Sequence, residues 1–283
     1  MKKTILVPID FSPSAQNALH YALAWAVELE ARLEVLHVYG GTFSLEEMPA
    51  FQLGHGREEA LLQRLTEFSQ IPAGVPGANL VLSRQLRLHP TVADAIVERS
   101  KEMAADYIVM GTKGSHDPFE RWLWSVSSTV AQRARCPVFL IPKPSRFQGF
   151  KHLLYASNFE SVSPPLIDQI SAWAQRYQAK VHFIHVDDIP GRPAEEFATL
   201  EDELYQRLFK NGDPPFPLNL ATVRASSVSK GLRQYASEND IDLLILVNRQ
   251  RQFWDNVLGE SLTKDMALGT TVPLLVLDYD TPQ

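Results

Sequence analysis

Two glycines and a serine stand where this chain could bind an anion. The apolar run 107–110 is typical of a buried parallel strand, and Gly111 and Gly114 follow it at once. Glycines at such points permit a tight turn or a close approach of the backbone to a ligand. Ser125 is expected to cap the next helix, because its hydroxyl can accept hydrogen bonds from the free N–H groups of a first helical turn. This pattern favours a phosphate-binding loop of the kind found in α/β proteins.

The elements that must position this loop alternate between strands and helices. Apolar runs predict strands at residues 5–9, 33–38, 79–88, 107–110 and 138–141. Helical spacing predicts helices at residues 13–30, 58–68 and 91–104, and from Ser125 onward. Ser12 followed by Pro13 is a favourable start for the first of them. The alternation predicts a parallel sheet with helices on both faces.

From residue 150 the same order of elements begins again. An offset of 148 relates Trp25 to Trp173, and later in the copies an offset of 136 relates Asp106 to Asp242. Two constant offsets indicate a tandem duplication with a deletion in the middle of the second copy. The predicted boundaries are residues 1–143 for the first domain, 144–149 for the linker and 150–283 for the second domain.

Composition narrows the possible partners and the compartment. The net charge of −6 and the pI near 5.8 argue against a broad surface for nucleic acid or anionic lipid. No apolar run approaches the ~20 residues that a membrane helix needs, so we expect no membrane partner. The lone Cys136 cannot form an intrachain disulfide, which fits a reducing compartment. The expected location is therefore the cytoplasm.

The motifs resemble those of the universal stress protein family over nearly the whole chain, in two copies. The matching segments of the first copy are residues 5–12, 36–38, 110–114, 125–126 and 136–138. The family's loop motif is Gly, two residues, Gly, nine residues, then Gly and Ser or Thr. Gly111, Gly114 and Ser125 match this motif, and Trp124 stands where the family has its last glycine.

The resemblance implies an ATP-binding α/β fold, with two open five-stranded parallel sheets of order 3-2-1-4-5. The residues implied on the adenine and ribose side are Asp10, Val38, Met110 and Gly111. Those implied on the phosphate side are Lys113, Gly114, Ser125 and Val126. Pro8 and Ile9 complete the implied nucleotide-binding set. Mg²⁺ would accompany ATP, and no protein metal site is expected.

The second copy departs from the motif at the same positions. The residues equivalent to Asp10, Gly111, Gly114 and Trp124 are Asn158, Val247, Gln250 and Glu260. A carboxylate near a phosphate is disfavoured by like-charge repulsion. We therefore expect nucleotide binding in the first domain only, with the second domain serving the structure or a partner surface.

Three hypotheses about function stay open from the sequence. The leading one is an ATP-binding stress-response regulator whose halves pack as a pseudo-dimer through their last strands, with homodimerisation also possible. The second is an interaction protein of the stress response that binds an unidentified protein partner without nucleotide. The third is a slow ATPase. The chain shows no catalytic constellation, so an enzyme is the least favoured of the three.

Overall fold

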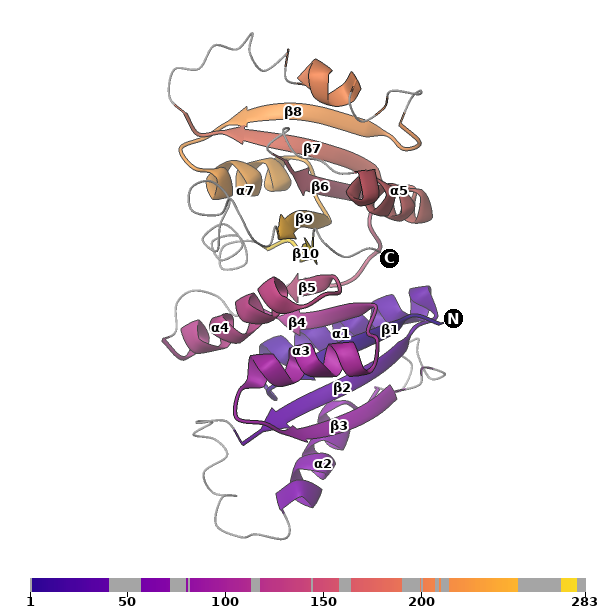
Figure 1. The fold of residues 1–283 in the computed structure, drawn as a ribbon, viewed down its shortest axis with the longest axis vertical. Coiled ribbons are helices and arrows are strands. Elements are labelled where there is room, and N and C mark those ends of the chain that lie inside the picture. Colours follow the sequence, from indigo (N-terminus) through magenta and orange to yellow (C-terminus); the bar gives the residue numbers. More distant parts are fainter. Residues whose placement is uncertain are drawn as a thin grey trace. The chain divides into compact units, whose positions relative to one another are not determined.

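A computed structural model describes most of the chain, and the described residues fall into two compact units. They are residues 2–40, 57–71, 80, 82–112, 118–143, 145–157, 164–189, 199, 201–206, 209, 214–248 and 271–278. The units span Met1–Phe147 and Gln148–Gln283. Each unit has its own set of five parallel strands (Figure 1). The predicted pairing of the two halves through their last strands stays a prediction.

The first unit is a doubly wound sheet in the order β3-β2-β1-β4-β5, with all neighbours parallel. Its strands are β1 (Thr4–Ile9), β2 (Arg32–Tyr39), β3 (Leu82–Leu88), β4 (Tyr107–Gly111) and β5 (Val138–Ile141). Its helices are α1 (Pro13–Leu29), α2 (Arg57–Phe68), α3 (Val92–Glu102) and α4 (Pro118–Arg133). Helices α3 and α4 lie side by side on one face and α1 lies on the other (Figure 1). The order 3-2-1-4-5 is confirmed.

The second unit repeats this arrangement in the order β8-β7-β6-β9-β10. Its strands are β6 (His152–Ala156), β7 (Lys180–Asp187), β8 (Leu218–Arg224), β9 (Leu243–Asn248) and β10 (Leu274–Asp278). Its helices include α5 (Pro164–Tyr177) and α7 (Val228–Glu238). The pairing of Ile5 with Tyr107 recurs as Leu153 with Leu243, which are the same positions shifted by 148 and 136. The strand register therefore reproduces the offsets of the sequence.

Aromatic packing anchors the first helix on the sheet. Trp25 of α1 is fully buried, and its ring lies 4.6 Å from that of Phe139 and 4.8 Å from that of Tyr107. The helix begins as the sequence predicts, because the Ser12 hydroxyl accepts a hydrogen bond of 3.2 Å from the Ala15 backbone N–H. Helix α1 is thus fixed at its start by its cap and near its end by the aromatic core beneath it.

An aspartate ties the fourth strand of each unit to the first strand. Asp106 accepts hydrogen bonds from the Thr4 backbone N–H and the Lys3 ammonium group, each at 2.8 Å. The equivalent Asp242 accepts from the backbone N–H groups of Lys151 at 2.7 Å and His152 at 2.8 Å. Both carboxylates therefore satisfy backbone donors at the beginning of the central strand.

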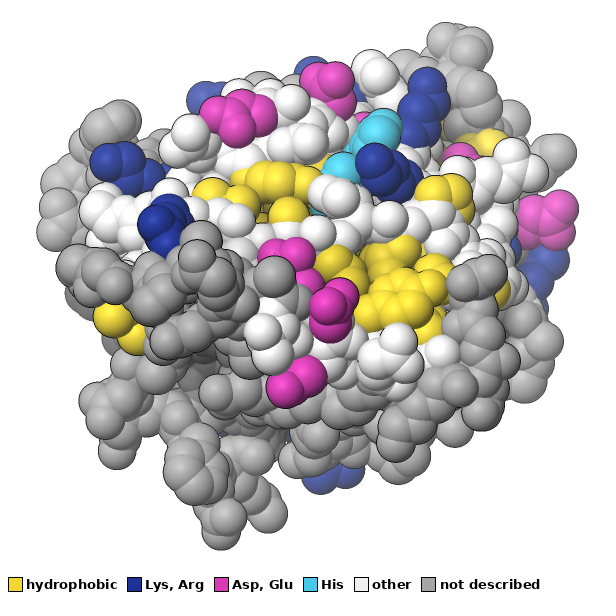
Figure 2. Space-filling model, turned by 90° about the horizontal axis from the view of Figure 1, so that it is seen from above, with side chains coloured by type: hydrophobic (Ala, Val, Ile, Leu, Met, Phe, Trp, Pro, Cys, Tyr) yellow, Lys and Arg dark blue, Asp and Glu magenta, His cyan; other side chains and the backbone are white. Residues whose placement is uncertain are grey.

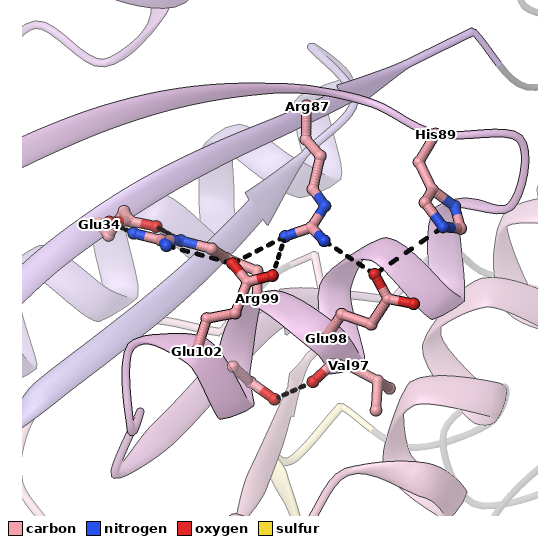
Figure 3. A network of polar contacts seen from close by, with 8 residues as sticks. Glu34, Arg87, His89, Val97, Glu98, Arg99 and Glu102 are labelled. Carbon is pink, nitrogen blue, oxygen red and sulfur yellow. Dashed lines mark hydrogen bonds and ion pairs between the residues drawn. The ribbon is translucent and has the colours of Figure 1, made fainter.

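A network of charges joins α3 to the strands β2 and β3 (Figure 3). The Glu34 carboxylate accepts hydrogen bonds from Arg99 Nε at 2.7 Å and Nη2 at 2.8 Å, and only 8% of the Glu34 side chain is exposed. Arg87 donates to Glu102 at 2.9 Å and to Glu98 at 2.7 Å. The hydrogen bond with Arg87 lowers the pKa of Glu102, and the one with Glu34 raises the pKa of Arg99. The network therefore holds the edge strand β3 against α3.

Removing Arg99 should expose the cost of the buried Glu34 charge. We expect Arg99→Met to lower the free energy of unfolding by about 3 kcal/mol, because Glu34 would lose its paired cation. The double variant Glu34→Leu/Arg99→Met should recover part of this loss. Arg133→Met is the control, since Arg133 is 54% exposed in its ion pair with Asp94 and should lose less than ~1 kcal/mol. Urea unfolding measures the three values, and equal losses for both single variants would contradict the argument.

Candidate functional site

The first unit has a topological switch point between β1 and β4. The pairing of β1 with β2 continues to Ile9 and His37, near the carboxyl ends of both strands. The pairing of β1 with β4 comprises Ile5 with Tyr107 and the next pair only. Beyond these pairs β1 and β4 are no longer held together by the ladder. Doubly wound sheets bind ligands in the crevice outside the carboxyl ends of strands at such a point.

The structure brings most of the predicted nucleotide-binding residues to this edge. Pro8, Ile9 and Asp10 lie at the carboxyl end of β1. Val38 lies at that of β2, and Met110 and Gly111 lie at that of β4. Pro8, Ile9, Val38 and Met110 are buried, whereas Asp10 and Gly111 are half-buried, as is Val126 on α4. The Ser127 hydroxyl donates to the Gly111 carbonyl at 3.4 Å, which places the segment after Val126 beside β4. Lys113, Gly114 and the side chain of Ser125 lie outside the described residues.

Asp10 is held in a turn between β1 and α1. Its Oδ1 atom accepts a hydrogen bond of 3.0 Å from the Ser12 backbone N–H, a local turn that aspartate and asparagine favour. Phe11 between them has a φ of 59°, in the left-handed region that residues with a side chain adopt rarely. The half-buried carboxylate is thus fixed at the sheet edge and can accept hydrogen bonds from hydroxyl or amino groups.

An aromatic cluster that the sequence did not predict lies beside Asp10. The ring of Phe11 is 4.4 Å from the imidazole of His37 and 5.4 Å from the ring of Phe68. The guanidinium of Arg64 lies 4.2 Å from the centre of the Phe11 ring. His37 is buried, and its Nδ1 atom is 3.0 Å from the Ile9 carbonyl oxygen. No spacing rule links α2 to this edge, so only the fold shows that Arg64 and Phe68 belong to it.

The packing of the fold requires a glycine at position 111, independently of any ligand. A Cβ atom added at this position would lie 2.5 Å from the Ser14 carbonyl oxygen and 3.1 Å from the Ala15 backbone nitrogen. The first turn of α1 therefore approaches the end of β4 too closely for any side chain. Val247 stands at the equivalent position of the second unit.

The prediction that Ser125 caps a helix is wrong. Helix α4 begins at Pro118, so Ser125 lies inside it. Proline suits the first turn of a helix, and no glycine or proline follows between residues 119 and 133 to interrupt the element. Inside a helix each backbone N–H is bonded to the carbonyl four residues earlier. The free N–H groups of α4 thus belong to the turn that begins at Pro118 rather than to Ser125.

The described residues contain no metal-ligand cluster, no reactive thiol and no membrane-spanning helix. Among them, no group of three His, Cys, Asp or Glu side chains could hold a metal ion. Burial raises the pKa of the Cys136 thiol to about 12, so this group stays protonated and unreactive at neutral pH. No helix within the described residues is long and apolar enough to cross a membrane.

Such a sheet, with helices on both faces and a topological switch point, defines a doubly wound α/β protein. The sequence profile of the Universal stress protein family matches residues 1–142 and 149–278. The chain belongs to this family and carries two copies of its domain.

Relatives and solved structures agree with this assignment. A universal stress protein of Thermus aquaticus is 35% identical over 147 residues, which cover 50% of this chain and 99% of that protein. Universal stress protein A homolog 1 of Coxiella burnetii is 28% identical over 147 residues, with 49% and 95% covered. The crystal structure of a universal stress protein from Archaeoglobus fulgidus has a TM-score of 0.68 at 14% identity, covering 98% of this chain and 99% of that one. This last likeness concerns the fold.

The close contact at Gly111 yields a stability prediction. Gly111→Ala should lower the free energy of unfolding by about 2 kcal/mol, because the new Cβ would press on the backbone of Ser14, which cannot rotate away. Urea unfolding with or without nucleotide measures the loss. Val247→Ala at the equivalent position is the control and should cost less, since it removes atoms from a half-buried site instead of adding one. A Gly111→Ala protein of unchanged stability would contradict the role given to this glycine.

Proposed function

We propose that the first unit binds ATP at the carboxyl edge between β1 and β4, and that occupancy of this site regulates a partner in the stress response. The observation that supports this most is the position of Asp10. Its carboxylate is fixed at the point where β1 and β4 separate, between buried apolar strand ends and an aromatic cluster. Binding rather than turnover would then be the function.

The proposed adenine and ribose side uses the described residues. Asp10 would accept hydrogen bonds from a ribose hydroxyl or an amino group of the base. Val38 and Met110, which are 9% and 6% exposed, would offer apolar contacts to the ring. Arg64 places a positive charge over the ring of Phe11, the residue that follows Asp10. This combination of apolar walls with few polar groups is common in small-molecule sites.

The proposed phosphate side is revised by the start of α4. Free N–H groups at a helix start attract anions, and in this chain they begin at Pro118. Phosphates would therefore contact Lys113, Gly114 and this first turn. Ser125 and Val126 lie inside the helix, so they would contact the nucleotide through their side chains and not through free backbone N–H groups. Mg²⁺ would enter as the companion of ATP. The proposed setting is the cytoplasm, which a free and unreactive Cys136 thiol fits.

A nucleotide-independent interaction protein is the second candidate. The close approach of the Ser14 backbone to Gly111 favours it, because this packing explains the glycine without a bound nucleotide. The loss of both loop glycines in the second copy also fits a domain that serves partners alone. A slow ATPase is a weaker possibility, since no described group is placed to orient a nucleophile.

Titration of ATP with the full chain tests the proposal. Asp10→Asn keeps the acceptor for the Ser12 N–H and removes only the charge, so the fold should survive while ATP affinity falls about tenfold. The second copy offers a matched control in Asn158→Ala, which should leave the affinity unchanged. Gly114→Val should abolish binding. Isothermal titration calorimetry measures the dissociation constants, and thermal unfolding checks each fold.

The outcomes separate the candidate functions. A chain with no saturable binding at millimolar ATP would contradict the proposal. A pull-down profile that is the same for Gly114→Val and the parent chain, whatever the ATP concentration, would favour the interaction protein. Phosphate release that depends on Gly114 would point to the ATPase.

A further inference from the structure

Two equivalent polar positions hold an ion pair in the first unit and a neutral pair in the second. The offset of 148 relates Glu34 to His182, and the offset of 136 relates Arg99 to Tyr235. The strand register agrees, because Glu34 pairs with Ser83 on β3 and His182 pairs with its equivalent, Asn219, on β8. The same place in the fold therefore holds two opposite charges in the first unit, and an imidazole with a phenol in the second unit.

The neutral pair belongs to a chain of hydrogen bonds. His182 is 2% exposed, and its Nδ1 atom lies 2.9 Å from the Tyr235 hydroxyl. Asn219 Nδ2 donates to that hydroxyl at 2.7 Å, and His152 Nδ1 lies 3.3 Å from His182 Nε2. With His182 neutral, all three contacts can be satisfied together: in one tautomer Asn219 donates to Tyr235, Tyr235 to His182 Nδ1, and His182 Nε2–H to His152. In this arrangement the imidazole of His182 must be neutral.

A proton on His182 would destabilise this arrangement. It turns Nδ1 into a donor, so the Tyr235 hydroxyl must rotate and give up its own hydrogen bond to His182, and it places a charge in a position that is only 2% exposed. The described groups that face His182 include no anion to balance this charge: they are Lys180 on its own strand, His152 on β6, Asn219 on β8 and Tyr235 on α7. Burial, with the charges of Lys180 and His152, lowers the pKa of His182 to about 4.

Part of this cluster is reachable by solvent. His152, Lys180 and Asn219 are half-buried, whereas His182 and Tyr235 lie beneath them. Figure 2 shows one face of the molecule, on which histidine side chains lie beside a Lys or Arg side chain. Protons can therefore reach the cluster once the contact with α7 loosens.

We propose that the second unit carries an acid-sensing contact, in which uptake of a proton by His182 releases Tyr235 and opens α7 from β7. The first unit keeps its equivalent contact closed over the same pH range, because Glu34 and Arg99 are held by opposite charges. Acid would thus act on one copy of the domain and spare the other. This inference does not depend on nucleotide binding.

The direction of the pH effect follows from linkage. The open state binds the proton with the ordinary histidine pKa of 6.5, and the closed state with a pKa of about 4. The open state therefore gains protons first, so the contact is fully stable above pH 6.5 and weakens as the pH falls toward 4. Between pH 7.5 and pH 5 the opening equilibrium of β7 should rise about thirtyfold.

Hydrogen exchange of the full chain provides the test, with the two copies as internal references. Peptides from β7 (Lys180–Asp187) and from β2 (Arg32–Tyr39) are compared between pH 7.5 and 5, after correction for intrinsic exchange rates. Protection of β7 should fall about thirtyfold, and protection of β2 should fall less than threefold. NMR titration of His182 should show an ionisation below pH 5.

Two kinds of variant connect the effect to His182. His182→Asn can place its amide oxygen near the position of Nδ1, as an acceptor for the Tyr235 hydroxyl, but it cannot titrate, so the pH response of β7 should disappear. The reverse exchange, Glu34→His with Arg99→Tyr, places the neutral pair in the first unit. In this variant β2 should show the pH response that β7 shows in the parent chain. His20 on α1 also has a pKa lowered by burial and by Arg146, and His20→Gln should leave the β7 response unchanged.

Three results would overturn the proposal. They are an equal loss of protection in β2 and β7, a β7 response that persists in His182→Asn, and an ionisation of His182 near pH 6.5. If the exchanged first unit fails to fold, the comparison of His182→Asn with the parent chain still decides the matter.

Discussion

The contact on which each unit depends most is the aspartate at the start of its fourth strand. Asp106 and Asp242 bind the backbone of the central strand, about a hundred residues earlier in the chain, at 2.7–2.8 Å. This long-range pairing places β4 beside β1, and β9 beside β6. The switch point of the order 3-2-1-4-5 lies at this pairing, since the other neighbour of the central strand, β2 or β7, is the next strand along the chain.

The switch point explains why the first turn of α1 and the end of β4 meet. The ladder between β1 and β4 stops early, and the backbone of Ser14 then comes within contact distance of Gly111. Asp10 lies in the turn between β1 and α1 and is fixed by its bond to the Ser12 N–H. The packing of one helix against one strand thus creates both the need for a glycine and the position of the carboxylate.

Local signals were enough to predict most of the fold, because buried parallel strands are apolar throughout and Ser12 with Pro13 marks a helix start. The site was predicted less completely. Ser125 looks like a cap in isolation, yet Pro118 starts the helix a turn or more earlier, and a helix continues until something stops it. The contact of Arg64 with Phe11 joins two distant segments, so no periodicity reveals it.

The exchange of Glu34 and Arg99 for His182 and Tyr235 shows what the fold requires at that place. A buried carboxylate without its guanidinium would cost several kcal/mol, and so would an imidazolium without an anion. Either residue alone is therefore unsuitable in the other copy, and the two positions must change together. What the fold requires is complementarity between β2 and α3, or between β7 and α7, rather than charge. A duplicated domain can thus vary the response of one copy to acid while the sheet, its order and its aspartate contact stay the same.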